Sequence, residues 1–244
     1  YEALRPLGIK PENIKLVMND TEKTPNSGPA GGSRSNVVTG NAIVAGCRKL
    51  LEAMKKPDGT FRTYDEMVAE KLPLRYEGKW TAPKTACDVD TGQGDPFSTY
   101  MYGVLMSEVA VDTTTGKTQV EKMTIVSDCG TIVNKLVLEG QIYGGLVQGI
   151  GLALSEDFED LKRHTTLTGC GIPQILDTPD NIEIIHQETP RPYGPYGASG
   201  VGEMPLSAPH ASIINAIYDA CGVRIKHLPA YPEKVLAGLK ELNK

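Results

Sequence analysis

The spacing of apolar residues along the chain predicts five helices. Recurrence at every third or fourth position, or a run bounded by helix start and stop signals, places them at residues 41–54, 64–72, 134–154, 208–220 and 232–239. The second begins at a capping box, in which the Thr63 hydroxyl and the Glu66 carboxylate each satisfy a free backbone amide. The fourth ends before Gly222, a residue suited to the left-handed conformation that follows many helices.

Runs rich in β-branched residues predict the strands. Residues 104–112 and 118–127 are joined by a polar turn in which Gly116 can take a positive φ, so together they predict a hairpin. Shorter strands are predicted at residues 14–18, 182–187 and 223–227. Because strands and helices do not alternate regularly, the predicted fold class is α+β.

Two polar, glycine-rich stretches interrupt these elements. Residues 19–40 precede the first helix, and residues 189–209 have too few apolar side chains to fold alone. A loop of the latter length in a compact domain is commonly functional. The whole chain has 26 glycines and 17 prolines against few aromatic residues (1 Trp, 10 Tyr and 3 Phe), which argues against a simple helical bundle.

Charge and composition exclude several functional classes. The 25 basic and 30 acidic residues give a formal charge of -5 without any block of like charges, so no nucleic-acid partner is expected. The longest apolar run, 136–154, is interrupted by five glycines, two glutamines and Glu139, so no membrane span is expected. The five cysteines lie far apart without a C-x-x-C pair, which suits a reducing compartment. We therefore expect a cytoplasmic protein, with a periplasmic location left open.

The first candidate for chemistry is the stretch 25–40, which places glycines, hydroxyls and one arginine before a predicted helix. The amides freed by Gly31 and Gly32, the hydroxyls of Ser33 and Ser35, and the Arg34 guanidinium could share a phosphate near the helix N-terminus. A solvated loop with an ordinary helix cap is the alternative.

The second candidate is the helix predicted at 134–154. Gln141, Gly144 or Gly145, and Gln148 would lie along one face, so that two amides flank a position without a side chain. Glutamine both donates and accepts, which suits the edge of a heterocycle or an oxo ligand. The alternative is a core helix whose glycines admit another element.

The third candidate is the loop 191–212, whose four glycines leave the main chain accessible. Glu203 is its only acidic residue, and a carboxylate in a water-poor loop can act as a general base. The alternative is a surface carboxylate in a mobile loop.

Five segments together make the chain recognisable. In order along the sequence they are GGSRSNVVTGNA, TGQGDPFSTYMYGV, VAVDTTTGKTQVEKMTIVSDCG, EGQIYGGLVQGIGLAL and PYGASGVGEMPL. With them the chain resembles the molybdenum hydroxylases, the family of xanthine dehydrogenases and aldehyde oxidoreductases, and most of all bacterial aldehyde oxidoreductases of the sulfate-reducer type. The resemblance implies that 1–244 is the C-terminal part of a molybdopterin-binding domain, with a sub-division near 85–190, and that a longer chain has been processed or divided.

The resemblance implies a molybdenum cofactor held by the dithiolene of molybdopterin, in its cytosine dinucleotide form, without a metal ligand from the protein. It assigns cofactor contacts to Gly31, Gly32, Ser33, Arg34, Ser35, Asn36, Lys135, Gln141, Gln148, Ser199, Gly200, Val201 and Gly202. Lys135 would add charge for the diphosphate, and the amides of 199–202 would approach the cofactor.

Glu203 occupies the place of the family's catalytic glutamate in G-x-G-E. The resemblance implies that it removes a proton from hydroxide on the metal while an aldehyde and water become a carboxylic acid and two electrons. Two iron-sulfur clusters elsewhere in the full protein would carry the electrons to an acceptor such as flavodoxin or ferredoxin, in a homodimer. The alternatives are a purine or N-heterocycle hydroxylase of the same family, and a non-catalytic nucleotide- or anion-binding module.

Overall fold

The computed structural model describes residues 1–18 and 20–242. Its contacts divide the chain into two compact units. The first unit comprises Tyr1–Thr99 with Arg191–Ser199, and the second comprises Tyr100–Pro190 with Gly200–Lys244. Within the described ranges, no helix combines the length and the apolar character that crossing a bilayer demands.

The first unit is built on one long helix. Its elements are η1 (Glu2–Leu7), η2 (Pro11–Asn13), α1 (Ser35–Met54), α2 (Tyr64–Ala69), the small hairpin β1 (Ala86–Cys87) and β2 (Gly94–Asp95), and η4 (Pro195–Gly197). Helix α1 begins at Ser35 rather than at the predicted Asn41. Polar residues in its first turns hide this start from the apolar pattern, although Val37 among them is buried.

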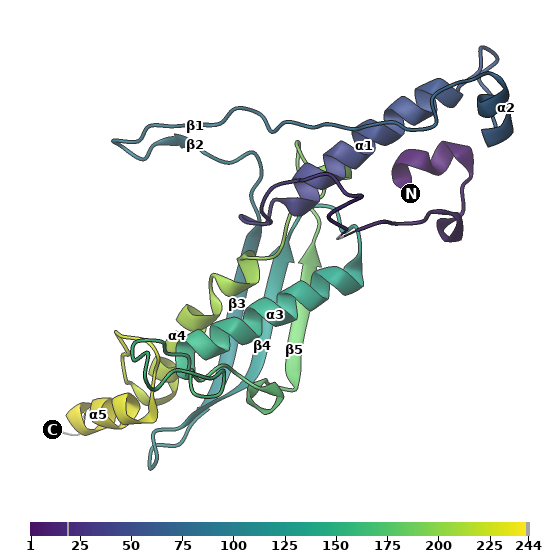
Figure 1. The fold of residues 1–244 in the computed structure, drawn as a ribbon. Coiled ribbons are helices and arrows are strands. Elements are labelled where there is room, and N and C mark those ends of the chain that lie inside the picture. Colours follow the sequence, from purple (N-terminus) through teal and green to yellow (C-terminus); the bar gives the residue numbers. More distant parts are fainter. Residues whose placement is uncertain (19, 243–244) are drawn as a thin grey trace. The chain divides into compact units, whose positions relative to one another are not determined.

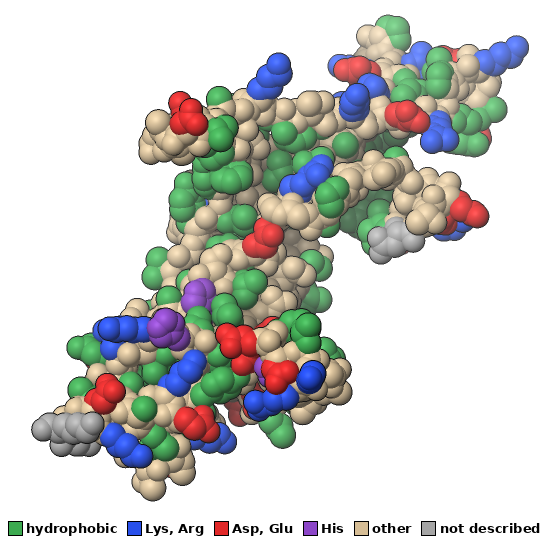
Figure 2. Space-filling model, turned by 60° about the vertical axis from the view of Figure 1, so that its left-hand side comes forward, with side chains coloured by type: hydrophobic (Ala, Val, Ile, Leu, Met, Phe, Trp, Pro, Cys, Tyr) green, Lys and Arg blue, Asp and Glu red, His purple; other side chains and the backbone are tan. Residues whose placement is uncertain are grey.

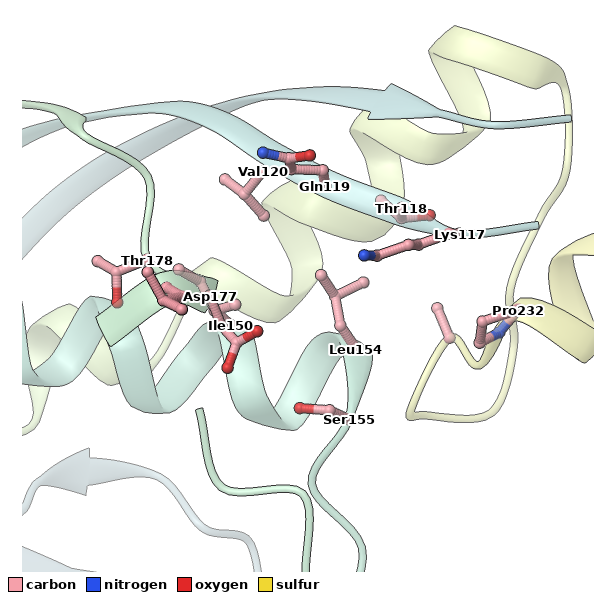
Figure 3. Close-up of a pocket in the computed structure, with 12 residues that line it drawn as sticks. Lys117, Thr118, Gln119, Val120, Ile150, Leu154, Ser155, Asp177, Thr178 and Pro232 are labelled. Carbon is pink, nitrogen blue, oxygen red and sulfur yellow. The ribbon is translucent and has the colours of Figure 1, made fainter. Parts of the chain in front are cut away.

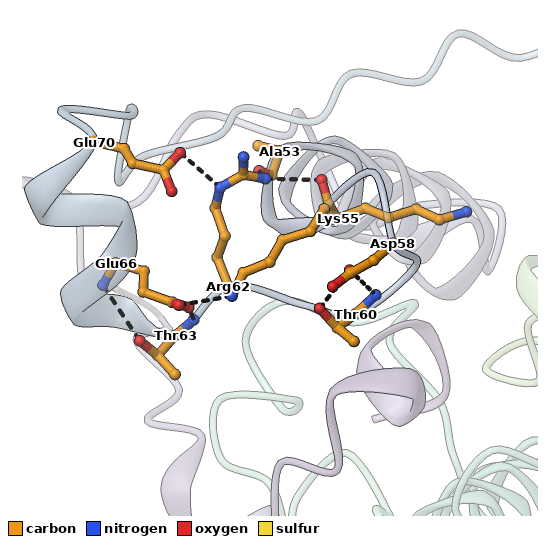
Figure 4. Close-up of polar contacts among 9 residues, drawn as sticks. Ala53, Lys55, Asp58, Thr60, Arg62, Thr63, Glu66 and Glu70 are labelled. Carbon is orange, nitrogen blue, oxygen red and sulfur yellow. Dashed lines mark hydrogen bonds and ion pairs between the residues drawn. The ribbon is translucent and has the colours of Figure 1, made fainter.

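Polar contacts fix the junction between α1 and α2 (Figure 4). The predicted capping box is confirmed, because the Glu66 amide donates to Thr63 Oγ1 over 3.3 Å and the Thr63 amide donates to Glu66 Oε2 over 2.8 Å. The Arg62 guanidinium donates to Glu70 over 2.8 Å and to the Lys55 carbonyl over 2.8 Å. Helix α2 ends at Ala69, before the predicted Leu72.

The second unit contains a three-stranded sheet. Its strands are β3 (Tyr102–Val111), β4 (Thr118–Asp128) and β5 (Asn181–Gln187), in the order β3-β4-β5. Strands β3 and β4 pair antiparallel around a turn in which Gly116 has a φ of 77°, which confirms the predicted hairpin. Strand β5 pairs parallel to β4, so the chain between them must cross over the sheet.

Helices cover one face of this sheet. The helices of the second unit are α3 (Lys135–Leu154), α4 (Pro209–Cys221) and α5 (Pro232–Leu242), with the short turns η3 (Ile175–Asp177) and η5 (Met204–Leu206). Helix α3 lies across the sheet beside α4 (Figure 1). The core is made of buried residues from both layers, including Met123, Ile125, Ile142, Leu146, Ile150, Ile213 and Ile217. This mixture of helices and sheet confirms the predicted fold class.

Two predicted strands are wrong. Residues 14–18 form no strand, and their apolar side chains Leu16, Val17 and Met18 are exposed instead of being paired on a sheet. Residues 223–227 form no strand either. Val223 is buried there, but it packs against Gly238 of α5. In both places the sequence has a short apolar run, but a strand also needs a hydrogen-bonded neighbour, which a short run does not reveal.

Glycines in the long helices contact prolines from short turns, from a loop and from the first residue of α4. A β-carbon at each glycine would lie under 3 Å from the ring it faces: 2.7 Å for Gly40 and Pro195, 2.7 Å for Gly145 and Pro205, 2.3 Å for Gly149 and Pro209, and 2.6 Å for Gly151 and Pro173. These glycine–proline contacts let loop backbone approach the helices more closely than any side chain would permit. Some of the 26 glycines and 17 prolines of the chain therefore serve to pack helices against neighbouring segments.

A partly buried chain of polar contacts joins α3 to the sheet. Ser127 Oγ lies 3.2 Å from His186 Nδ1, and His186 Nε2 lies 3.1 Å from Glu139 Oε1. The Lys135 amine lies 3.7 Å from the same carboxylate. The hydrogen bond from His186 is the main cause that lowers the pKa of Glu139 below its usual 4.5, and the Lys135 charge adds to it.

We expect the replacement His186→Phe to raise the pKa of Glu139 towards its usual value. Because the folded-state pKa is depressed, Glu139 stabilises the fold above its unfolded-state pKa, and this contribution is lost as the pH falls through the folded value. Carboxyl-carbon NMR titration measures the change. Lys135→Met is the comparison variant and should shift the pKa less, and an unchanged pKa in His186→Phe would contradict the assignment.

Surface charge is spread in both signs. On the face shown in Figure 2, Lys and Arg side chains are interspersed with Asp and Glu rather than gathered by sign. This agrees with the lack of any block of like charges along the sequence.

Candidate cofactor and catalytic site

The glycine-rich stretch of the first unit leads directly into α1. Gly32 and Ser33 both have positive φ values, of 64° and 52°, so the backbone turns sharply before the helix begins. The N-cap residue Arg34 makes no side-chain capping hydrogen bond, so an anion could accept from the first-turn amides of α1, beginning at Ser35. The Arg34 guanidinium instead donates to the carbonyls of Ser27 and Pro29 over 3.3 and 3.4 Å and closes the loop.

Two asparagines of α1 hold the loop 191–199. Asn36 Nδ2 donates to the carbonyl of Ser199 over 2.7 Å, and Asn41 Nδ2 donates to the carbonyl of Tyr193 over 2.9 Å. Between them, Gly40 receives Pro195 in one of the glycine–proline contacts. We call these three contacts the loop clamp. Asn36 therefore holds the loop in this structure, whereas the family resemblance assigned it to the cofactor.

Removing one member of the loop clamp should loosen the loop. We expect Asn36→Ala to cost about 1 kcal/mol, the usual net contribution of one hydrogen bond, and to speed amide hydrogen exchange across 191–199. Asn13→Ala, in the same unit but on η2, is the control and should leave that exchange unchanged. Equal exchange in Asn36→Ala and the parent chain would show that the hydrogen bond does not fix the loop.

Ser199 carries a polar atom that needs a partner. The residue is 6% exposed, and its hydroxyl has no hydrogen-bond partner among the residues that the structure describes. A buried hydroxyl without a partner is costly, so a bound polar group would satisfy it. Gly200, which follows, is buried as well.

Two adjacent glycines of helix α3, in the second unit, have different surroundings. Gly144 is exposed, and a β-carbon there would meet nothing within 4 Å, whereas one at the adjacent Gly145 would collide with Pro205. Gln141 and Gln148 are exposed and lie on the same face as Gly144. Gly145 therefore admits another element, as one of the two sequence interpretations expects. Gln141, Gly144 and Gln148 lie together on the opposite, solvent-exposed side, which we call the exposed α3 face.

Lys135 stands at the beginning of α3. Its side chain is mostly exposed, and it pairs with Glu139, which is itself bonded to His186. The Asn134 side chain caps the helix by accepting from the Val137 amide over 3.2 Å. A cation at a helix N-terminus is disfavoured by the helix dipole, and the ion pair with Glu139 offsets this.

Glu203 projects from a turn that is anchored on both sides. Val201 and Met204 pack against the core of the second unit, and the Met204 sulfur fills the space beside Gly103 in β3. The Glu203 carbonyl accepts from the Leu206 amide over 3.2 Å, which closes the short turn η5. Glu203 itself is exposed, as is Gly202. The anchors hold the backbone of the glutamate while its side chain stays accessible.

The structure thus groups the predicted residues within each unit. In the first unit, Asn36 bonds directly to Ser199, and the stretch from Gly31 to Ser35 leads into the same helix. In the second unit, the segment after Glu203 packs on α3, the helix that carries Gln141 and Gln148. Among the described residues there is no cluster of three or more metal-ligating side chains.

A cavity of about 290 Å³ in the second unit lies apart from these residues (Figure 3). It is lined by the start of β4, the end of α3 and the turn η3, with the Lys117 amine reaching into it above Ile150 and Leu154. Sequence reasoning missed it because its lining comes from segments far apart along the chain. None of the predicted site residues lines it.

Comparison with known proteins gives these features a context. The family model of the molybdopterin cofactor-binding domain matches residues 2–179. The chain is 58% identical to the aldehyde oxidoreductase of Megalodesulfovibrio gigas over 241 residues, which cover 98% of this chain and 27% of that protein.

Solved structures agree with this. The aldehyde oxidoreductase from Desulfovibrio desulfuricans matches with a TM-score of 0.93 and 67% identity, over 97% of this chain and 26% of that one. The aldehyde oxidoreductase from Desulfovibrio gigas matches with a TM-score of 0.94 and 58% identity, over 98% of this chain and 26% of that one. The chain spans about a quarter of the length of these relatives. It belongs to the molybdopterin cofactor-binding domain family.

Proposed function

We propose that the chain forms part of a molybdenum-dependent aldehyde oxidoreductase, in which it binds one side of the cofactor and supplies the general base. The observation that carries this proposal is its identity of 58–67% to aldehyde oxidoreductases across 97–98% of its own length. The net reaction is an aldehyde plus water giving a carboxylic acid, two protons and two electrons.

Three features of the chain fit the cofactor. The first-turn amides of α1 have no N-cap side chain and suit the phosphates, as the sequence pattern of Gly31 to Ser35 predicts. The buried Ser199 hydroxyl lacks a partner among the described residues and suits a pterin edge. The exposed α3 face presents two amides beside a bare backbone. We propose the cytosine dinucleotide form of the cofactor.

The residues of the chain have separate tasks in this reaction. When bound, the molybdenum cofactor supplies the two-electron oxidation. The Glu203 carboxylate accepts a proton from the water oxygen that becomes part of the acid, which requires it within hydrogen-bond reach of that oxygen. Because Glu203 is exposed in this chain, the cofactor and other parts of the enzyme must supply the water-poor surroundings that favour a carboxylate base. Iron-sulfur clusters in those other parts would carry the electrons away.

Metal analysis of the intact enzyme tests the proposal. We expect about one molybdenum atom for each copy of this chain, together with oxidation of an aldehyde to its acid with oxygen from labelled water. A purified, folded enzyme without molybdenum would overturn the proposal. Oxidation of purines in place of aldehydes would overturn the substrate class alone.

The exposed α3 face can be tested separately. We expect Gly144→Leu to lower the molybdenum content of the intact enzyme, because the new side chain would occupy the bare backbone between Gln141 and Gln148. Folding should persist, since nothing lies within 4 Å of this position in the chain. Thr114→Leu, at an exposed position on the β3–β4 turn, is the control and should keep the molybdenum content of the parent enzyme. Full molybdenum content in Gly144→Leu would remove this face from the cofactor site.

A further inference from the structure

The face of the β3–β4–β5 sheet that points away from α3 and α4 carries a contiguous apolar surface. Its centre is a row of three residues in register, in which Val104 pairs with Val126 and Val126 pairs with Ile185. Met106 and Tyr102 flank Val104 on the same face of β3. Val104 and Met106 are 67% and 63% exposed. We call this surface the outer sheet face.

Such a surface is unusual for a sheet face that is exposed to solvent. An antiparallel sheet with one solvated face alternates between apolar and polar residues, whereas parallel pairing is common in sheets that are covered on both faces. Here β4 and β5 pair parallel, and apolar residues occur on both faces at their centre. Large apolar side chains that are exposed next to one another, rather than scattered singly, are typical of interaction sites.

The charges at one end of the outer sheet face are unbalanced. Lys122 lies 3.9 Å from Glu108 and 3.3 Å from Glu183, so one ammonium group serves two carboxylates. Thr124 also donates to Glu183 over 3.4 Å. This end therefore keeps a net negative charge, and a covering surface would complement it with a lysine or arginine.

The relatives indicate where a covering segment would come from. The chain corresponds to 26–27% of the length of the aldehyde oxidoreductases it resembles, so such a polypeptide has about three quarters of its residues elsewhere. A segment on the same polypeptide meets this face at a high effective concentration. A second copy fits less well, since an isologous contact repeats the same negative end and brings no additional cation.

We propose that the outer sheet face is the docking surface for another segment of the same, longer polypeptide, which presents an apolar centre and a basic side chain towards Glu108 and Glu183. The inference rests on the proposed function insofar as that function places the chain in a larger enzyme. It adds an interface within that enzyme that is separate from the cofactor residues.

Thiol labelling of the intact enzyme tests this. The variants are Val104→Cys and Met106→Cys, with Thr114→Cys on the β3–β4 turn as the exposed control. Each is treated with N-ethylmaleimide in the native and the unfolded state, and the labelled peptides are resolved by mass spectrometry. We expect native labelling at 104 and 106 to be at least ~10-fold slower than after unfolding, because a covered thiol reacts only through local opening.

Each outcome decides between occupants. Equal native and unfolded rates at 104 and 106 would overturn the proposal, and protection that disappears on dilution would overturn it in favour of a second copy. The charge reversal Glu108→Lys with Glu183→Lys should remove the protection, whereas Glu241→Lys on α5 should not, and retained protection in the double variant would exclude a basic partner. Molybdenum content measured on the same samples reports on the proposed function independently.

Discussion

Glu203→Gln in the intact enzyme is expected to lower kcat for aldehyde oxidation by at least ~100-fold, the scale on which general-base catalysis contributes. The amide has almost the same shape as the carboxylate but cannot accept the proton. The backbone around it should not change, because the turn depends on the packing of Val201 and Met204 and on the main-chain bond from Leu206 to Glu203. Molybdenum content should therefore equal that of the parent enzyme.

The matched control for this variant is Glu121→Gln. Glu121 is also an exposed glutamate of the second unit, and it lies at the irregularity in the β3–β4 pairing, outside the predicted site residues. It should retain the parent kcat. Steady-state rates normalised to molybdenum compare the two variants, and a parent-like rate in Glu203→Gln would exclude it as the base.

Gly145→Val is expected to destabilise the second unit by roughly 1–3 kcal/mol or more, the usual range for overpacking a well-packed site. A β-carbon at this position would lie 2.7 Å from Pro205 Cβ and 3.1 Å from the Leu206 amide nitrogen. Neither neighbour can turn aside, since one is a proline ring and the other is backbone. The segment that follows Glu203 would have to move, so turnover should fall together with stability.

The adjacent residue provides the control. Gly144→Val makes the same chemical change one position earlier in α3, where nothing lies within 4 Å. Its unfolding free energy should stay within about 0.5 kcal/mol of the parent, as for most surface substitutions. Denaturant unfolding of both variants measures the difference. Equal unfolding midpoints would show that Pro205 can accommodate a side chain at position 145.

Local signals in the sequence were sufficient for most of the fold. The hairpin at Gly116, the capping box at Thr63 and Glu66, and the stop at Gly222 each depend on the conformational preference of a few adjacent residues, and each is confirmed. The strands predicted at 14–18 and 223–227 failed because strand formation depends on a distant partner. Val223 shows the ambiguity, since it is apolar and buried but packs on a helix.

In the candidate site, too, the features set by neighbouring residues were predictable and those set by distant segments were not. The pattern identified the exposed α3 face with Gln141 and Gln148, because helical periodicity fixes which residues share a side. It did not show that Arg34 bonds to the loop carbonyls or that Asn36 bonds to Ser199, since these contacts depend on how loops return to the helix. Whether Gly144 or Gly145 was the open position also required the location of Pro205.

The glycine–proline contacts have a consequence for the entropy of binding. Proline restricts its own φ in the unfolded chain, so the turns that carry Pro195 and Pro205 lose less freedom on folding than ordinary loops. A glycine surface and a rigid ring also offer no rotamers to rearrange when a ligand arrives. A large flat cofactor would thus meet backbone that is already ordered, and little of its binding free energy would be spent on ordering the protein.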